Sequence, residues 1–512
     1  MNRSGLRWIA WFALAAVLPP AAAAGQAAAI PSRADTLAAI HLLQRATFGA
    51  RPADVAAVLT VGPETWLDRQ LHPETIDDSA LEARLELFPG ATASPARLFE
   101  LFPPPTVDAA DRLGSPGRIV ADLALARLHR SVRSERQLEE VMTQFWFNHF
   151  NVDFTRDRAK WLVGDYERRA IRPNVFGRFE DLLVATARHP AMLVYLDNWR
   201  SRAPDPASPR PDREKGINEN YARELMELHT LGVDGGYDER DVAEVARAFT
   251  GWTVVGLSER EALDRSLRGV RYEFLPELHD PGSKTVMGET VGPAGEAEGV
   301  AILRRLARHP GTARRIARRL GEAFVADEPP PALVDELERV FLATDGDLRA
   351  VTRALFLSAP FRDPAARAAK LRTPFELMAA ALRMTGVEFG RSTDLPLALQ
   401  ELDQMPYMTS PPTGYPEDAT AWLGGGAILG RARFALALAT GRLDGVETPA
   451  WAWGEASPEH VAAMATALLP GTDTEALERA VLADVGAAGP AGPRPAARAL
   501  ALVLGSPAFQ RQ

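Results

Sequence analysis

The residues Asn218-Glu-Asn-Tyr-Ala-Arg-Glu-Leu-Met-Glu-Leu-His-Thr-Leu-Gly232 combine a dense polar cluster with apolar residues at spacings of three and four. An α-helix turns by about 100° per residue, which places Tyr221, Leu225 and His229 on one apolar face. Asn218 can cap the start of such a helix, and Gly232 can end it. The pattern therefore predicts an amphipathic helix with His229 at the centre of its apolar face.

The polar face of this helix carries Glu219, Arg223 and Glu227, whose spacings of four predict a solvated ladder of ion pairs. Glu224 lies on the border between the two faces. A histidine on an apolar face is either a hydrogen-bonded core residue or a ligand, and both interpretations of His229 stay open at this point.

The same apolar spacing recurs along the rest of the chain, whereas the long alternating patterns of strands are scarce. We therefore predict a mainly α fold, a multi-helix globular body with a small β-hairpin insertion around 253–292. Short β-branched segments bounded by glycine suggest this insertion. We expect a main helical domain at 35–445 and a C-terminal helical segment at 446–512 that packs on it. Helices are predicted at 35–46, from 51, from about 134 to 149, and at 160–172, 178–188, 191–197, 218–231, 239–250, 296–308, 311–324, 331–343 and 346–357.

Residues 1–29 combine Arg3 and Arg7 with an apolar run from Trp8 to Leu18 and a following alanine-rich stretch. These features predict a cleaved export signal, with an uncleaved N-terminal anchor as the alternative. The mature protein is then expected to be periplasmic or secreted. No later apolar run reaches the roughly 20 residues that a membrane-spanning helix needs.

The composition excludes several classes of protein. The chain has 512 residues with 58 basic and 67 acidic side chains, and a formal net charge of -9 argues against binding to nucleic acid. The sequence has no cysteine, which excludes disulfides, thiolate metal sites and thiol nucleophiles. A content of 24% charged and 46% hydrophobic residues is typical of a globular protein.

Two further histidines are candidate metal ligands or acid–base residues. His149 ends an apolar stripe within Phe145-Trp-Phe-Asn-His-Phe150, and His279 lies beside Asp280 in a turn that leads to Lys284. If these segments converge, His149, His229, His279 and Asp280 supply ligands for a divalent transition metal such as zinc, iron or manganese.

The predicted catalytic set is Glu224, His229, His279, Asp280 and Lys284, which without a metal would act as general acids and bases in an apolar pocket. Asn148, Glu219 and Arg223 are the predicted substrate-binding residues. The first two would orient ligands, and Lys284 or Arg223 would bind an anionic group of the substrate. The sequence has no His-Glu-x-x-His motif and no Gly-x-Ser-x-Gly motif. The glycines at 424–426 lack the spacing of a dinucleotide site and suit the start of a helix.

Segments from nearly the whole chain resemble the secreted bacterial family known as domain of unknown function 1800. The resemblance implies an exported protein and, as a possible partner, a co-secreted protein of alkaline-phosphatase-like appearance, but it implies no established reaction. The segments that carry it are His41–Gly49, Phe145–Phe150, His189–Asn198, Asn218–Tyr237, Ala246–Trp252, His279-Asp280 with Lys284, Lys370–Glu376, Gly414–Pro416 and Ser506–Arg511.

Two functions follow from these observations. The first is an exported hydrolase, metal-assisted or not, whose pocket is built from histidine, glutamate and aspartate side chains. The alternative is a non-catalytic envelope scaffold or binding partner, in which the same groups form a buried network that fixes helix packing. The proline-rich loop at 201–215 is a lid, a binding loop or a mobile segment.

Overall fold

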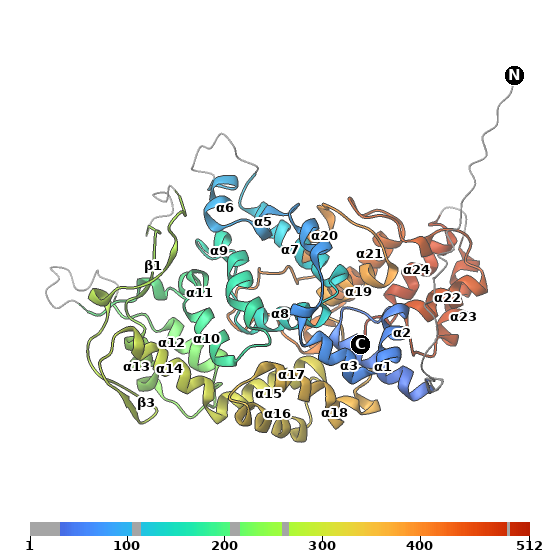
Figure 1. Ribbon diagram of the computed structural model, residues 1–512. Coiled ribbons are helices and arrows are strands. Elements are labelled where there is room, and N and C mark those ends of the chain that lie inside the picture. The colour runs from blue at the N-terminus through green and yellow to red at the C-terminus, as the bar shows by residue number, and fades with distance from the viewer. Residues whose placement is uncertain (1–30, 105–113, 205–215, 259–265, 489–491) are drawn as a thin grey trace, which may run out of the picture.

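The computed structural model describes residues 31–104, 114–204, 216–258, 266–488 and 492–512. Within these residues the chain forms 24 α-helices, several short 3₁₀ or π-helical turns and four short strands (Figure 1). The predicted mainly α fold is confirmed. The predicted export signal at 1–29 and most of the predicted loop at 201–215 lie outside the described residues.

Helices α1–α8 build the N-terminal part of the described chain. Ser32 caps α1 and forms a capping box with Asp35, so the cap lies three residues before the position that the sequence pattern suggested. Apolar spacing predicts no helix between 63 and 133. Several short helices in this range begin with proline, and their short lengths break the regular spacing of apolar residues. The bounds are α1 Arg33–Ala46, α2 Pro52–Val61, α3 Pro63–Gln70, α4 Ser79–Leu85, α5 Pro89–Thr92, α6 Pro95–Leu101, α7 Gly117–Arg133 and α8 Gln137–His149.

The predicted helix at 218–231 differs in form from the expectation. It consists of α12 (Asn220–Glu224), which continues as a π-helix over Leu225–His229. Thr230 Oγ1 donates to Leu225 O at 2.6 Å, and this bond accompanies the wider turn. His229 is 2% exposed, so its predicted place on the buried face is confirmed. The neighbouring helices are α9 Ala159–Tyr166, α10 Phe179–Ala187, α11 Pro190–Tyr195 and α13 Glu239–Ala248.

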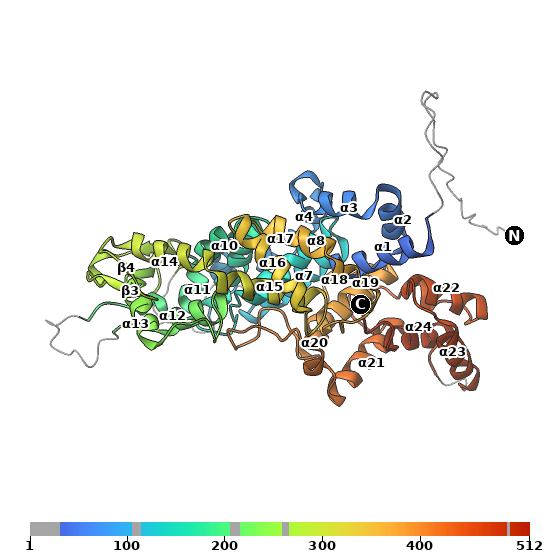
Figure 2. The same cartoon turned by 90° about the horizontal axis from the view of Figure 1, so that it is seen from below.

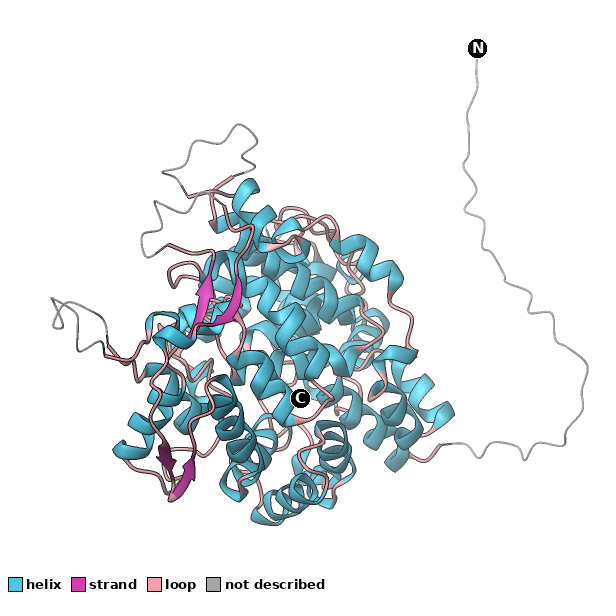
Figure 3. Cartoon of the chain, turned by 60° about the vertical axis from the view of Figure 1, so that its left-hand side comes forward, coloured by secondary structure: helices cyan, strands magenta, loops and turns pink. Residues whose placement is uncertain are grey.

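The β insertion consists of two hairpins rather than one (Figure 3). Strand β1 (Trp252–Val255) pairs antiparallel with β2 (Arg271–Phe274), and β3 (Lys284–Val286) pairs antiparallel with β4 (Glu289–Val291). The ring of Trp252 packs directly on Gly299 of α14 (Glu296–Arg308), where a Cβ atom would lie 2.7 Å from the indole. A side chain at 299 would therefore separate the first hairpin from α14.

The helices from 296 to 357 match the predictions to within one or two residues. Their regular apolar spacing is interrupted only by short turns, so local pattern alone locates them. α15 packs against α16, and α16 packs against α17. The bounds are α15 Pro310–Phe324, α16 Pro331–Ala343, α17 Leu348–Leu357 and α18 Ala359–Arg362.

The C-terminal helices share one buried apolar core with the rest of the chain, which extends from Leu42 to Phe509. In Figure 2, α22–α24 lie at one end of the molecule, and α24 packs on α21. The final residues return to the middle of the fold, because Leu371 pairs with Arg511 and Gln512 N donates to Lys370 O at 2.9 Å. The bounds are α19 Pro374–Thr385, α20 Asp394–Glu401, α21 Gly425–Ala439, α22 Pro458–Leu468, α23 Glu475–Ala487 and α24 Pro495–Gly505.

The glycines at 424–426 begin α21, as the sequence predicted. None of the helices in the described ranges is both long enough and apolar enough to cross a lipid bilayer.

Candidate functional site

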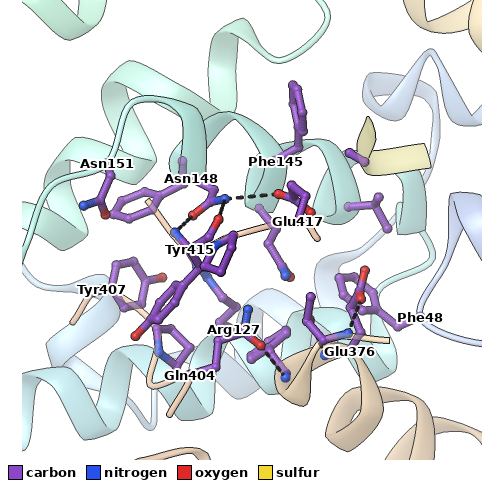
Figure 4. A pocket seen from close by; sticks show the side chains of 18 of the residues that line it. Phe48, Arg127, Phe145, Asn148, Asn151, Glu376, Gln404, Tyr407, Tyr415 and Glu417 are labelled. Carbon is purple, nitrogen blue, oxygen red and sulfur yellow. Dashed lines mark hydrogen bonds between the residues drawn. The ribbon is translucent and has the colours of Figure 1, made fainter. Parts of the chain in front are cut away.

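A pocket of about 70 Å³ lies between α7, α8, the start of α19 and the loop at 404–417 (Figure 4). A cavity needs roughly 10–15 Å³ to hold one water molecule, so this pocket has room for one small ligand. Aromatic rings and polar side chains alternate around it. Its lining residues include Phe48, Arg127, Gln144, Phe145, Asn148, Phe324, Thr373, Phe375, Glu376, Gln404, Tyr407, Tyr415 and Glu417.

Asn148, at the end of α8, fastens the loop that closes the pocket. Its Nδ2 donates to Tyr415 O at 2.8 Å and to Glu417 Oε1 at 3.1 Å, and its Oδ1 accepts from Tyr415 N at 2.7 Å (Figure 4). Asn151 adds bonds from its Nδ2 to Thr409 O at 2.9 Å and to Pro411 O at 3.0 Å. The loop is therefore held by side-chain amides, although it has little regular structure of its own.

Gly414 makes the close approach of this loop to α8 possible. Its φ is +75°, and a Cβ atom at this position would lie 2.3 Å from Asn148 O and 2.5 Å from Asn148 Oδ1. A larger residue would both strain the backbone and push the loop away from Asn148.

Two carboxyl groups line the pocket from different elements. Glu417 follows the loop, and its Oε1 accepts the hydrogen bond from Asn148. Glu376 is in the first turn of α19, where its Oε2 accepts from Thr373 N at 2.8 Å in a capping box. In Figure 4, Glu417 lies beside Asn148 and Phe145, whereas Glu376 lies near Phe48.

The environments of these two carboxyl groups differ. Burial raises the pKa of Glu417; Arg319 opposes this shift, and the charge of Glu376 adds to it. Burial lowers the pKa of Arg45 to about 9, and the pKa values of Arg372 and Arg431 to about 10, while Glu376 raises all three. Three buried guanidinium groups therefore share the field of the Glu376 carboxylate.

A buried ionic network forms the wall of the pocket at Arg127. Arg127 pairs with Glu167, Tyr407 Oη donates to Glu167 Oε2 at 2.7 Å, and the Arg127 guanidinium lies 4.1 Å from the centroid of the Tyr407 ring. Burial would raise the pKa of Glu167, but Arg127 and Arg172 outweigh this effect and lower it to about 2. The network fixes Tyr407, whose φ of +67° is unusual for a residue with a side chain.

The site residues predicted from the sequence lie in two groups instead of one shared pocket. His149 and His229 are together, because His149 Nε2 lies 3.1 Å from His229 O and the two ring centroids are 6.4 Å apart. Both rings are buried among aromatic side chains, and burial lowers both pKa values, that of His229 to about 3. These surroundings favour the interpretation of both histidines as core residues over their interpretation as ligands.

The second group contains His279, Asp280 and Lys284, together with Glu298, which the sequence analysis missed. Lys284 Nζ forms an ion pair with Glu298 Oε2 at 2.5 Å, and both side chains are fully buried. His279 Nδ1 donates to Thr250 O at 2.8 Å, which leaves Nε2 to accept from Lys284 Nζ at 3.3 Å. These bonds join β3 to α14. Glu298 can be recognised as a member of this group only once the contact between β3 and α14 is known.

The remaining predicted residues have different surroundings. Asn148 lines the pocket beside Glu417, whereas the predicted histidines and Asp280 do not line it. Arg223 pairs with Glu239 at 2.8 Å and with Glu219 at 3.3 Å on the surface, so the predicted Glu219 pair forms, whereas Glu239 takes the place predicted for Glu227 among the described residues. Glu224 is half-buried, and burial raises its pKa. Asp280 pairs with Arg247 at 2.8 Å. In the part of the chain that the structure describes, no group of three or more histidine, aspartate or glutamate side chains is placed to hold a metal ion.

Comparison with known families gives one match. The model of the family described as protein of unknown function (DUF1800) matches residues 41–511. The chain belongs to this family. Comparisons with curated proteins and with solved structures find no match.

In this DUF1800 protein four of the segments that carried the family resemblance meet at the pocket. Phe48, Asn148, Glu376 and Tyr415 come from four of those segments, which are remote in sequence. Glu376 and Glu417 were not predicted as site residues. Glu376 ends one resembling segment and Glu417 directly follows another, so only the proximity of these segments to a pocket could have drawn attention to them.

We predict that breaking the buried ion pair destabilises the fold. Glu298→Gln leaves the Lys284 ammonium buried without its counterion and should lower the free energy of unfolding by about 3 kcal/mol. The double variant Lys284→Met/Glu298→Leu should lose less, because no buried charge remains. Urea unfolding measures both effects. The exposed pair Arg479–Glu475 provides the control, since Glu475→Gln should cost under about 0.5 kcal/mol. A Glu298→Gln variant as stable as the control would contradict the assignment.

We also predict that His229 makes stability depend on pH. An unfolded histidine binds a proton near pH 6.5, whereas the ring of His229 stays neutral in the fold down to a pKa of about 3. The free energy of unfolding should therefore fall as pH is lowered from 7 to 5, by about 2 kcal/mol for this residue. His229→Leu should remove that part of the fall in urea unfolding at the two pH values, and His72→Leu, at an exposed site, should not. An unchanged fall in His229→Leu would show that the ring titrates normally.

Proposed function

We propose that this protein is a hydrolase of the acid–base type, with Glu417 as the general acid and Glu376 as the general base. The observation that carries the proposal is that two carboxyl groups in contrasting environments line one pocket. Pairs of acids whose surroundings differ in this way are a recurring arrangement of acid–base enzymes. This proposal keeps the hydrolase predicted from the sequence but moves its chemistry away from the histidines.

The proposed reaction uses each carboxyl group once. Glu417, whose raised pKa keeps its proton available at higher pH, gives that proton to the leaving group as the scissile bond breaks. Glu376 takes a proton from the water molecule that forms the new bond. Exchange with solvent then returns both groups to their starting states.

Two side chains act as positioning residues in this scheme. Asn148 holds Oε1 of Glu417, and the Thr373 backbone holds Oε2 of Glu376. None of the described residues hydrogen-bonds the other oxygen of either carboxyl group, which leaves it for the reacting atoms. Phe145 and Phe375 line the same pocket, where their rings limit the access of bulk water.

The alternative function, a non-catalytic scaffold or binding partner, is favoured by the network around Lys284. That network is fully buried at Lys284 and Glu298 and joins a hairpin to a helix, as expected of groups that fix packing. It accounts for His279 and Lys284 but leaves the pocket at Glu376 and Glu417 without a role.

The acid–base proposal is tested with Glu417→Gln and Glu376→Gln, with Glu401→Gln at an exposed position on α20 as the matched control. The probes are p-nitrophenyl glycosides, p-nitrophenyl acetate and p-nitrophenyl phosphate. Each pocket variant should lower kcat/KM for the probe that is cleaved by about 100-fold or more, with an unchanged fold by circular dichroism. The wild-type rate should fall as pH rises through the pKa of Glu417, and Glu417→Gln should lose this limb. No cleavage of any probe by the wild type, or full activity of both variants, would overturn the proposal.

We further propose that the protein works outside the cytoplasm, because residues 1–29 have the charge, apolar run and small residues of an export signal. N-terminal sequencing of protein recovered from the cell envelope should then find a start shortly after Ala22–Ala24. An intact Met1 in a cytoplasmic fraction would contradict this localisation.

A further inference from the structure

The charges around the pocket argue against an anionic ligand. Arg127 forms an ion pair with Glu167. Lys370, which lies behind the loop, forms an ion pair with Asp327 and donates a hydrogen bond to Glu417 O at 2.8 Å. An anionic ligand would therefore meet no free cation among the described lining residues. A cationic ligand would meet the Arg127 guanidinium as well as the carboxyl groups of Glu376 and Glu417, so the nature of the ligand has to be argued from hydrogen bonding and shape.

The polar groups of the pocket can both donate and accept hydrogen bonds. Gln144 Oε1 is buried and receives no hydrogen bond from the described residues. Gln404 Oε1 accepts from Phe375 N at 2.8 Å, so the amide nitrogen of Gln404 remains as a donor. Gln144 Oε1, the amide nitrogen of Gln404 and the second oxygens of Glu376 and Glu417 therefore offer both acceptors and donors. A hydroxyl group, which both donates and accepts hydrogen bonds, matches them.

The apolar part of the lining is aromatic. The ring centroids of Phe145 and Phe324 are 5.9 Å apart, and those of Phe48 and Phe375 are 6.1 Å apart. Aromatic faces carry partial negative charge and attract C–H groups that are polarised by neighbouring oxygens. A ring with apolar faces and hydroxyl groups at its edge satisfies both kinds of lining.

We propose that the pocket binds one residue of an uncharged sugar and that the substrate of the proposed hydrolase is a glycoside. The cleavage of a glycoside rests on the proposed function, whereas the binding of a sugar does not. Glu417 would give its proton to the glycosidic oxygen as the bond from this oxygen to the anomeric carbon breaks. A water molecule would form the new bond to that carbon, and Glu376 would take the proton that the water loses.

Gln144 provides a test of this ligand, because its buried oxygen accepts no hydrogen bond from the described residues and needs a donor such as a hydroxyl group. A hydroxyl group of the sugar would donate to Gln144 Oε1 and remove the cost of an unpaired buried acceptor. Gln144→Leu should weaken sugar binding about tenfold or more. Gln400→Leu, at an exposed position on α20, is the matched control and should leave binding unchanged.

The test measures binding to the full-length Glu417→Gln variant, which binds without turning over. Isothermal titration calorimetry and saturation-transfer NMR would use the methyl glycosides of glucose, galactose, mannose, xylose and N-acetylglucosamine. Tetramethylammonium chloride and inorganic phosphate serve as charged probes. At least one glycoside should bind, with loss in Gln144→Leu and none in Gln400→Leu.

The outcomes separate the two proposals. Binding of a glycoside without cleavage of any glycoside by the wild type supports the ligand class and overturns the acid–base reaction. Cleavage of p-nitrophenyl acetate or phosphate, with no glycoside bound, overturns the ligand class and leaves the reaction standing. Binding of tetramethylammonium or phosphate in place of every glycoside, or equal glycoside binding by Gln144→Leu, also overturns the ligand class.

Discussion

The amide group of Asn148 anchors the part of the loop, at Tyr415 and Glu417, on which the pocket depends. Its nitrogen and oxygen together bind the backbone of Tyr415 on both sides and reach the carboxyl group of Glu417. The end of α8, the loop and one of the two acids are thereby placed by one side chain. The contact also requires glycine at 414, since any Cβ atom there would collide with Asn148.

The molecule contains two buried polar networks of different character. The network at Lys284 and Glu298 is closed, because its charges satisfy each other and both side chains are inaccessible to solvent. At the pocket, Gln144 Oε1 accepts no hydrogen bond from the described residues, and only one oxygen of each acid is bonded by them. Closed networks specify packing, whereas incompletely satisfied groups beside a cavity are typical of a binding site.

Local sequence pattern was sufficient for most helices but not for the site. The helices at 296–357 were located because their apolar spacing is regular, and His229 was placed correctly on a buried face. His149 and His229 also lie together, where the His149 ring nitrogen Nε2 is hydrogen-bonded to the backbone oxygen of His229. The grouping of His279 with them was not found, because apolar spacing describes neighbours on one helix and carries no information on which remote segments touch. Glu376 and Glu417 were missed for the same reason, since only tertiary packing brings them to one pocket.

The return of the final residues to the middle of the fold has a consequence for when the pocket can form. Phe509 O and Gln510 Oε1 accept hydrogen bonds from Arg372 and Arg431, two of the guanidinium groups that share the field of Glu376. These acceptors follow every residue of the pocket in the order of synthesis. Until these acceptors dock, two buried guanidinium groups lack these partners, so the pocket reaches its final form only after residues 509–510 have been made and have packed against Arg372 and Arg431.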